Sequence, residues 1–175
     1  MAEVGRSHIP GERPISLFML VGIPGSGKST WAKAFLKEHP NYQLVSTDQI
    51  RAHLYGDEAT QGNWPQVWQQ VLAQWQSGID QVHRGTLAGV IYDATNTRRR
   101  HRRQAIDTAK TLGFNTITLV WFDLPLAVCL GRNRERSRQV PPEVLVKMHR
   151  QLRGAPPSEG EKVDRVLRIT TAETR

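Results

Sequence analysis

The hydrophobic positions of the chain gather in short runs that alternate with polar or amphipathic stretches. Five apolar runs have the length and composition of buried strands: 16–22, 42–46, 87–92, 115–122 and 164–170. Helix-favouring segments lie between them or follow them: 28–38, 64–84, 98–112, 125–136 and 142–152. This rhythm predicts an α/β fold in which a parallel sheet is covered by helices on both faces. Ligands of such sheets bind beyond the carboxyl ends of the strands, so we look for chemistry there.

Three tryptophans share one predicted helix. Trp64, Trp68 and Trp75 are spaced by four and seven residues, which places them on one side of the segment 64–84. We interpret this stripe as core packing; the alternative is a platform on which nucleic-acid bases stack.

The start of the chain differs from the rest. Residues 1–14 contain glycine and proline but no hydrophobic periodicity, which predicts a flexible N-terminal arm. Residues 15–175 are then expected to form one domain, because 175 residues suit a single domain with a short extension.

The charge of the chain adds a preference for anionic partners. There are 24 Lys and Arg against 16 Asp and Glu, a net charge of +8. Most of the excess lies around 98–103 and 132–138. Such runs are either solvated helix faces or surfaces that meet nucleic acid, a nucleotide or an anionic lipid.

Cysteine content and hydropathy exclude several kinds of site and of protein. Cys129 is the single cysteine, which excludes an intramolecular disulfide framework and a Cys-rich zinc site. The longest apolar run, 15–23, is too short to span a bilayer, and no small-residue cleavage site follows it. The sequence therefore predicts a soluble, cytoplasmic protein without a membrane partner.

The most specific motif lies directly after the first predicted strand. Residues 22–29 match G-x-x-x-x-G-K-S/T at every defined position and precede a predicted helix. The glycines let backbone N–H groups surround phosphate oxygens, Lys28 reaches the β- and γ-phosphates, and the Ser29 hydroxyl ligates Mg²⁺. This predicts a nucleoside triphosphate site, with ATP and Mg²⁺ as cofactors. The expected nucleotide-binding residues here are Gly22, Pro24, Gly25, Ser26, Gly27, Lys28, Ser29 and Thr30.

Two carboxylates follow other predicted strands. Asp48 comes after the second strand, where it could accept the proton of an attacking hydroxyl while Arg51, one helical turn on, holds an anionic acceptor. Asp93 ends the third strand, where P-loop proteins place an acidic residue near Mg²⁺, and Asn96 is expected to line the same rim. For both aspartates, capping of the following helix is an equally open interpretation.

Arginines near residue 134 suggest a lid. Arg132 and Arg136 lie four residues apart on the predicted helix 125–136, so they share a face, with Asn133 beside them. Arginines at this place could close over the phosphates and neutralise the charge that develops during transfer. A plain pair of surface arginines is the alternative.

Together these segments resemble the P-loop kinase domain of the 5′-hydroxyl polynucleotide kinase family. The resemblance runs over about 16–153 and is carried by Gly-Ile-Pro-Gly-Ser-Gly-Lys-Ser-Thr-Trp-Ala (22–32), Ser-Thr-Asp-Gln-Ile-Arg (46–51), Asp-Ala-Thr-Asn (93–96) and Arg-Asn-Arg-Glu-Arg (132–136). It implies a three-layer P-loop NTPase fold with a five-stranded parallel sheet, a helical lid, and the loop-bearing strand beside the Asp93 strand.

The resemblance also implies roles for single residues. Asp48 becomes the general base on a 5′-hydroxyl, Arg51 the contact to the acceptor's phosphate, and Arg136, with Arg132, a lid arginine. Lys28 and Arg136 join Asp48 as the expected catalytic residues, and Ser29 with Asp93 as the metal-binding pair. The chain has no D-x-D-G-T segment, so the phosphatase that some relatives carry is absent from it.

Three functions are compatible with these motifs. The leading hypothesis is an ATP-dependent kinase that acts on 5′-hydroxyl ends of DNA or RNA. The second is a small-molecule kinase with the same core, acting on a sugar, a nucleotide sugar or an antibiotic hydroxyl. The third is a regulatory protein that binds a nucleotide and signals by ordering its lid.

Overall fold

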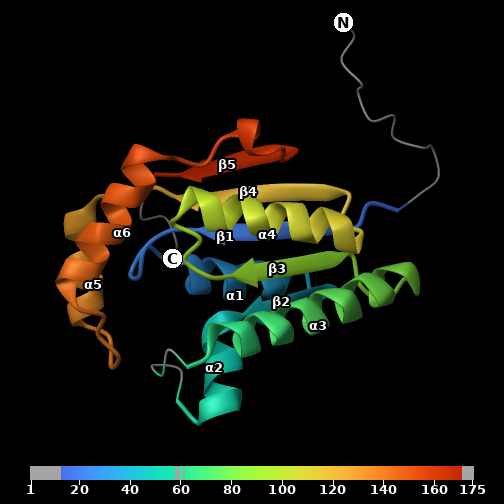
Figure 1. The fold of residues 1–175 in the computed structure, drawn as a ribbon, viewed down its shortest axis with the longest axis horizontal. Helices are drawn as coiled ribbons and strands as arrows, with labels where there is room; N and C mark the ends of the chain where they lie inside the picture. Colours follow the sequence, from blue (N-terminus) through green and yellow to red (C-terminus); the bar gives the residue numbers. More distant parts are fainter. Residues whose placement is uncertain (1–12, 58–59, 61, 171–175) are drawn as a thin grey trace, which may run out of the picture.

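The computed structural model describes residues 13–57, 60 and 62–170, and a five-stranded parallel sheet lies at its centre. The strand order is β2-β3-β1-β4-β5 (Figure 1), and every neighbouring pair is parallel. The strands are β1 (Ser16–Val21), β2 (Tyr42–Ser46), β3 (Gly89–Asp93), β4 (Thr116–Phe122) and β5 (Arg165–Ile169). The predicted α/β class, the five strands and the adjacency of the first and third strands are confirmed.

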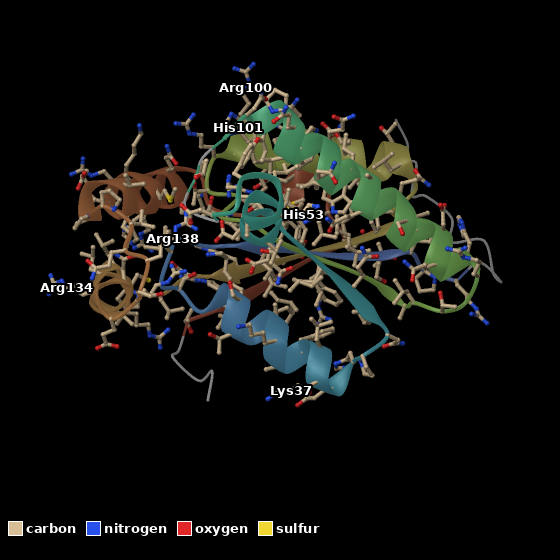
Figure 2. All side chains as sticks on the ribbon, turned by 90° about the horizontal axis from the view of Figure 1, so that it is seen from below. Lys37, His53, Arg100, His101, Arg134 and Arg138 are labelled. Carbon is tan, nitrogen blue, oxygen red and sulfur yellow. The ribbon has the colours of Figure 1, made fainter. Side chains whose placement is uncertain are left out.

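Helices cover both faces of this sheet. They are α1 (Lys28–Glu38), α2 (Thr47–Tyr55), α3 (Trp64–His83), α4 (Arg99–Leu112), α5 (Leu126–Arg134) and α6 (Pro142–Gly154), followed by a short 3-10 turn, Glu159–Glu161. Figure 2 shows α1 on one side of the sheet and α3 with α4 on the other. The helices α5 and α6 lie together at one end of the sheet (Figure 1), where they form the lid.

The core lies between the sheet and these helices. The central strands β1, β3 and β4 are almost entirely buried, because a parallel sheet with helices on both faces leaves its middle strands no contact with water. The largest buried side chains include Trp75, Tyr92 and Phe114, whose rings meet nearly at right angles. Trp75 and Tyr92 have their centroids 5.1 Å apart.

The tryptophan stripe is core only at one end. Trp75 is fully buried, Trp68 is half-buried, and Trp64 is 49% exposed. The core interpretation is therefore wrong for Trp64. The helix spacing correctly placed the three indoles on one side of α3, but Trp64, in the first turn, is covered only in part and stacks on Trp68.

Two further expectations concern the N-terminal arm and membrane-spanning helices. The predicted N-terminal arm, 1–14, lies outside the described residues except for Arg13 and Pro14, which have no regular secondary structure. Within the described ranges, every helix is too short or too polar to cross a lipid bilayer.

Candidate active site

The phosphate-binding loop connects β1 to α1 and depends on its glycines. Gly25 and Gly27 have φ values of 80° and 96°, in the left-handed region that other residues rarely adopt. A Cβ on Gly25 would lie 2.5 Å from the backbone oxygen of Cys129, so the loop also packs too tightly against α5 for a side chain. Gly27 caps α1 without a side chain, which leaves the N–H groups of the first helical turn available to an anion.

Lys28 is the charged group at the centre of this loop. Its ammonium Nζ is buried and donates to the carbonyl of Ile23 at 3.0 Å. Burial lowers the pKa of Lys28, while the carboxylates of Asp93 and Asp48 oppose this by favouring the charged ammonium. A bound phosphate would add negative charge at this point, so the site favours an anion.

Ser29 and Asp93 come together as the sequence predicted. The Ser29 hydroxyl, in the first turn of α1, donates to the Asp93 carboxylate Oδ2 at 2.7 Å, and Asp93 is the last residue of β3. Hydroxyl and carboxylate oxygens are the hard donors that Mg²⁺ prefers, completed by water and substrate phosphates. The hydroxyl of Ser26, a buried residue of the loop, has no hydrogen-bond partner among the described residues. These residues fit a phosphate with its Mg²⁺.

Asp48 lies at the start of α2, among arginines. Ser46 is the cap of this helix, since its hydroxyl accepts from the Gln49 N–H, so Asp48 is not the cap. Arg51 Nη1 donates to Asp48 Oδ1 at 3.1 Å, and Arg138 Nη1 lies 3.8 Å from the other oxygen, Oδ2. The Asp48 side chain remains 46% exposed, so an acceptor can reach it.

Asn96 fastens the loop after β3 to the end of β1. Its side-chain amide donates to the carbonyl of Leu20 at 2.7 Å, and its backbone has an unusual positive φ of 48°. The neighbouring carbonyl of Thr95 accepts from the Gly22 N–H at 3.0 Å. Asn96 lines the same cavity as Asp93, but the contact that the structure gives its amide is to the protein backbone.

The lid differs from the predicted arrangement in one respect. The helix α5 ends at Arg134, so Arg136 lies in the loop that follows and does not continue the helical face of Arg132. Both arginines nevertheless line the cavity. Asn133 is buried and bonds the backbone of Val140 twice, accepting from its N–H at 3.0 Å and donating to its carbonyl at 2.8 Å. This pair closes the loop that carries Arg136 and Arg138.

These elements enclose one cavity of about 1160 Å³ beyond the carboxyl ends of β1 and β3. This volume exceeds the roughly 300–1,000 Å³ of a usual small-molecule site, which leaves room for a donor and an acceptor. Its predicted members are Pro24, Gly25, Gly27, Lys28, Ser29, Thr30, Asp48, Arg51, Asp93, Asn96, Arg132 and Arg136. The other two predicted loop residues, Gly22 and Ser26, are buried behind it.

Three residues outside the predicted site, Arg138, Trp64 and Trp68, also line the cavity. Arg138 lies beyond the end of α5, so helical spacing did not connect it to Asp48, although it belongs to the basic run 132–138. Trp64 and Trp68 lie on α3, which packs against α2, the helix that carries Asp48 and Arg51. The stacking alternative for the tryptophans was the signal that pointed to them. Figure 2 shows Arg138 on the inner side of the lid, toward the sheet, and Arg134 at the outer edge of the molecule.

The basic run 98–103 divides between surface and core. Arg98 lines the cavity, and Arg99, Arg100 and Arg103 are exposed. Arg102 is fully buried and forms two hydrogen bonds to Glu161, at 2.8 Å and 2.6 Å. Arg102 therefore does not belong to an anion-facing surface, because its guanidinium is already paired inside the protein.

The β1–loop–α1 unit, the carboxylate at the end of β3 and the arginine-bearing lid define a P-loop kinase fold. Residues 17–155 match the family described as an AAA domain, and the chain belongs to this family. The predicted P-loop kinase domain is thereby confirmed.

The proteins that this chain resembles are named for different phosphate acceptors. Over 137 residues the chain is 28% identical to L-seryl-tRNA(Sec) kinase of Methanococcus maripaludis, covering 76% of this chain and 51% of that protein. It thus spans about half the length of this curated relative.

Two solved structures share the fold. A chain of the Pnkp1/Rnl/Hen1 RNA repair complex gives a TM-score of 0.65 at 21% identity, covering 93% of this chain and 49% of that one. A gluconokinase from Sinorhizobium meliloti 1021 gives a TM-score of 0.53 at 20% identity, covering 92% of this chain and 85% of that one. At these identities the likeness concerns the fold alone.

Proposed function

We propose that the protein is an ATP-dependent kinase that transfers the γ-phosphate of ATP to the 5′-hydroxyl end of a DNA or RNA strand. The observation that carries this proposal is the position of Asp48. Its carboxylate faces the same cavity as the phosphate loop and is flanked by Arg51 and Arg138. A carboxylate that can take a proton, beside guanidinium groups that can hold a phosphate, suits a hydroxyl next to a phosphodiester.

The donor half of the site would hold the triphosphate. Lys28 and the free N–H groups of α1 contact the phosphates, and Arg132 with Arg136 covers them from the lid. Ser29 and Asp93 would hold Mg²⁺, which when bound neutralises charge on the phosphates. The arginines would stabilise the charge that develops as the terminal phosphoryl group moves.

The acceptor half would activate the hydroxyl. Asp48 accepts the proton of the 5′-hydroxyl as that oxygen forms a bond to the γ-phosphorus. The bond between this phosphorus and the bridging oxygen breaks, and ADP leaves with the electron pair. Arg51 and Arg138, which contact Asp48, would turn in part to the phosphate that follows the acceptor nucleoside.

The charge of the cavity favours a polynucleotide over a neutral small molecule. Asp48 and Asp93 are the acidic lining residues in the described part of the chain. The basic ones are Lys28, Arg51, Arg98, Arg132, Arg136, Arg138 and Lys147. A triphosphate needs only part of this positive charge. Arg51 and Arg138, which contact Asp48, would suit an acceptor that carries phosphates of its own.

The proposal is tested by labelling. The protein is incubated with γ-labelled ATP, Mg²⁺ and a 5′-hydroxyl oligonucleotide, beside the 5′-phosphorylated oligonucleotide and the Lys28→Ala variant. We expect label on the hydroxyl end only, and none with the variant. If ATP binds but no oligonucleotide is labelled, the acceptor is not a polynucleotide, and sugars and other small hydroxyl compounds become the candidates.

The role of Asp48 gives a quantitative prediction. Asp48→Asn keeps the size of the side chain but removes the proton acceptor, so transfer should slow by about 10²- to 10⁴-fold. ATP affinity should hardly change. The measurement is single-turnover transfer with parallel ATP titration. The matched control is Asp107→Asn, an exposed aspartate of α4 that does not line the cavity. An unchanged transfer rate in Asp48→Asn would show that Asp48 is not the proton acceptor.

A further inference from the structure

An exposed tryptophan stands at the wall of the acceptor half. Trp64 is the first residue of α3 and lines the cavity together with Asp48 and Arg51. Among the described residues, it and Val128 are the exposed large hydrophobic side chains. Exposure of an indole to water is unfavourable, and Trp75 on the same helix avoids it completely. Trp64 therefore lacks the packing that explains the other end of the stripe.

The exposed indole continues a stack that begins in the core. Trp64 lies on Trp68 with ring centroids 6.0 Å apart and planes inclined by only 23°. Trp68 in turn meets the edges of Trp75 and Tyr92, at 5.5 Å and 6.5 Å. The inner indole is thus held by buried rings, and the outer one is half exposed and lines the cavity.

The start of α3 is also tied to the helix that carries the acceptor residues. Tyr55, at the end of α2, donates its hydroxyl to the side chain of Gln66 at 2.9 Å, and the same hydroxyl accepts from the Asn63 N–H at 3.0 Å. Since Asp48 and Arg51 lie on α2, these bonds hold Trp64 at a defined place relative to them.

We propose that Trp64 and Trp68 form a stacking platform for the nucleobase at the 5′ end of the acceptor strand. This inference rests on the proposed function and names what the site recognises beyond the phosphate. Bases stack on indoles irrespective of their identity, because every base has a π-face. A nucleotide also joins a flat base to a phosphate, which matches an indole platform beside Arg51 and Arg138. The platform would bind any terminal base, whatever its identity.

The test compares two acceptors that differ only in the terminal base. One is a single-stranded 5′-hydroxyl oligonucleotide, and the other carries an abasic residue at its 5′ end. The variants are Trp64→Ala and Trp64→Phe. The control is Val128→Ala, the other exposed hydrophobic residue, which does not line the cavity. Oligonucleotide Kd, acceptor KM and ATP affinity are measured for each.

We expect Trp64→Ala to weaken binding of the intact oligonucleotide by about 5- to 150-fold, the range that base–aromatic stacking supports. Binding of the abasic oligonucleotide and of ATP should not change. Trp64→Phe should restore most of the loss, and Val128→Ala should resemble the unaltered protein. Intact acceptor should also quench tryptophan fluorescence more than abasic acceptor does.

Contrary outcomes separate the two proposals. If the unaltered protein phosphorylates both oligonucleotides and Trp64→Ala weakens both equally, or neither, the platform is overturned and the kinase activity stands. If the unaltered protein phosphorylates neither, both proposals fail. If Trp64→Ala then weakens the binding of a saccharide acceptor, the two indoles bind a sugar instead of a base. Circular dichroism checks that the variants fold, which the exposure of Trp64 leads us to expect.

Discussion

At the scale of single residues, the groups that would handle phosphate are bonded to the protein itself. Lys28 donates to the carbonyl of Ile23, Ser29 to Asp93, and Arg51 to Asp48. Each of these bonds gives a polar group a partner within the protein, and each is one that a substrate oxygen can replace. The site is therefore held in shape before a ligand arrives, at the cost of exchanging these partners when it binds.

Gly25 sets the tightest local constraint in the loop. Gly25→Ala would require a non-glycine residue at a φ of 80° and a Cβ 2.5 Å from the Cys129 backbone oxygen. Because neither the helix backbone nor the loop can move freely, we expect a loss of about 1–3 kcal/mol in the free energy of unfolding. Nucleotide affinity should fall as the loop shifts. Urea denaturation and nucleotide titration measure the two effects.

Gly131 supplies the comparison for that prediction. It lies within α5, its Cβ would meet nothing within 4 Å, and its φ is not positive. Gly131→Ala should therefore leave stability unchanged or raise it slightly, because alanine favours a helix. Equal effects of the two substitutions would mean that the Gly25 contact with α5 does not limit the loop.

At the scale of elements, the lid depends on one side chain that joins its two ends. Asn133 lies in the last turn of α5, and Val140 lies just before α6 begins at Pro142. The two hydrogen bonds between them leave the intervening residues as a closed loop that presents Arg136 and Arg138 to the cavity. An asparagine suits this place because its amide both donates and accepts.

Asn133→Ala should open the lid loop. It leaves the backbone N–H and carbonyl of Val140 without these partners, which costs about 1–3 kcal/mol where they are shielded from water. Trypsin, which cuts after arginine, should cleave the loop 134–138 faster, and the proposed phosphoryl transfer should slow because Arg136 and Arg138 are no longer held. The time course of limited proteolysis, followed by mass spectrometry, measures the opening.

The control for the lid is an exposed bond across the same loop. Gln139 donates its side-chain amide to the Arg134 carbonyl at 2.9 Å, but both groups face water. Gln139→Ala should change cleavage little, since water replaces the lost partner. Indistinguishable cleavage of the Asn133→Ala and unaltered proteins would show that another contact holds the lid.

At the scale of the whole molecule, a buried ion pair joins distant parts of the chain. Arg102 of α4 bonds both oxygens of Glu161, and both side chains have no exposed surface. The same guanidinium donates to the carbonyls of Asn96 and Ala155, the latter directly after α6. One side chain thus ties α4 to the loop beside Asp93 and to the end of the lid.

Arg102→Ala should destabilise the fold strongly. It leaves the Glu161 carboxylate buried without its partner, which costs about 3–5 kcal/mol in the free energy of unfolding. Its neighbour Arg103 is exposed, so Arg103→Ala should stay within about 0.5 kcal/mol. Urea denaturation of both variants measures these changes in the free energy of unfolding. Similar values for the two would contradict the assignment of Arg102 to the core.

The class of fold and the position of the phosphate loop could be predicted from the amino-acid sequence alone. The five strands, the phosphate loop and the pairing of Ser29 with Asp93 follow from hydrophobic runs and from motifs contained in a few residues. Such features are local, because a buried strand must be apolar and a phosphate loop must bend at glycine. Their meeting at one edge of the sheet follows from parallel strands.

Which members of a group of similar residues are buried, and which are exposed, depends on the tertiary structure. Trp64 is exposed while Trp75 is buried, Arg102 is internal while Arg103 is not, and Arg138 approaches Asp48 from far along the chain. Burial and ion pairing depend on what packs over a side chain, and the covering elements lie elsewhere in the sequence. Residues of the same type and spacing therefore differ in role only once the helices and the lid are placed on the sheet.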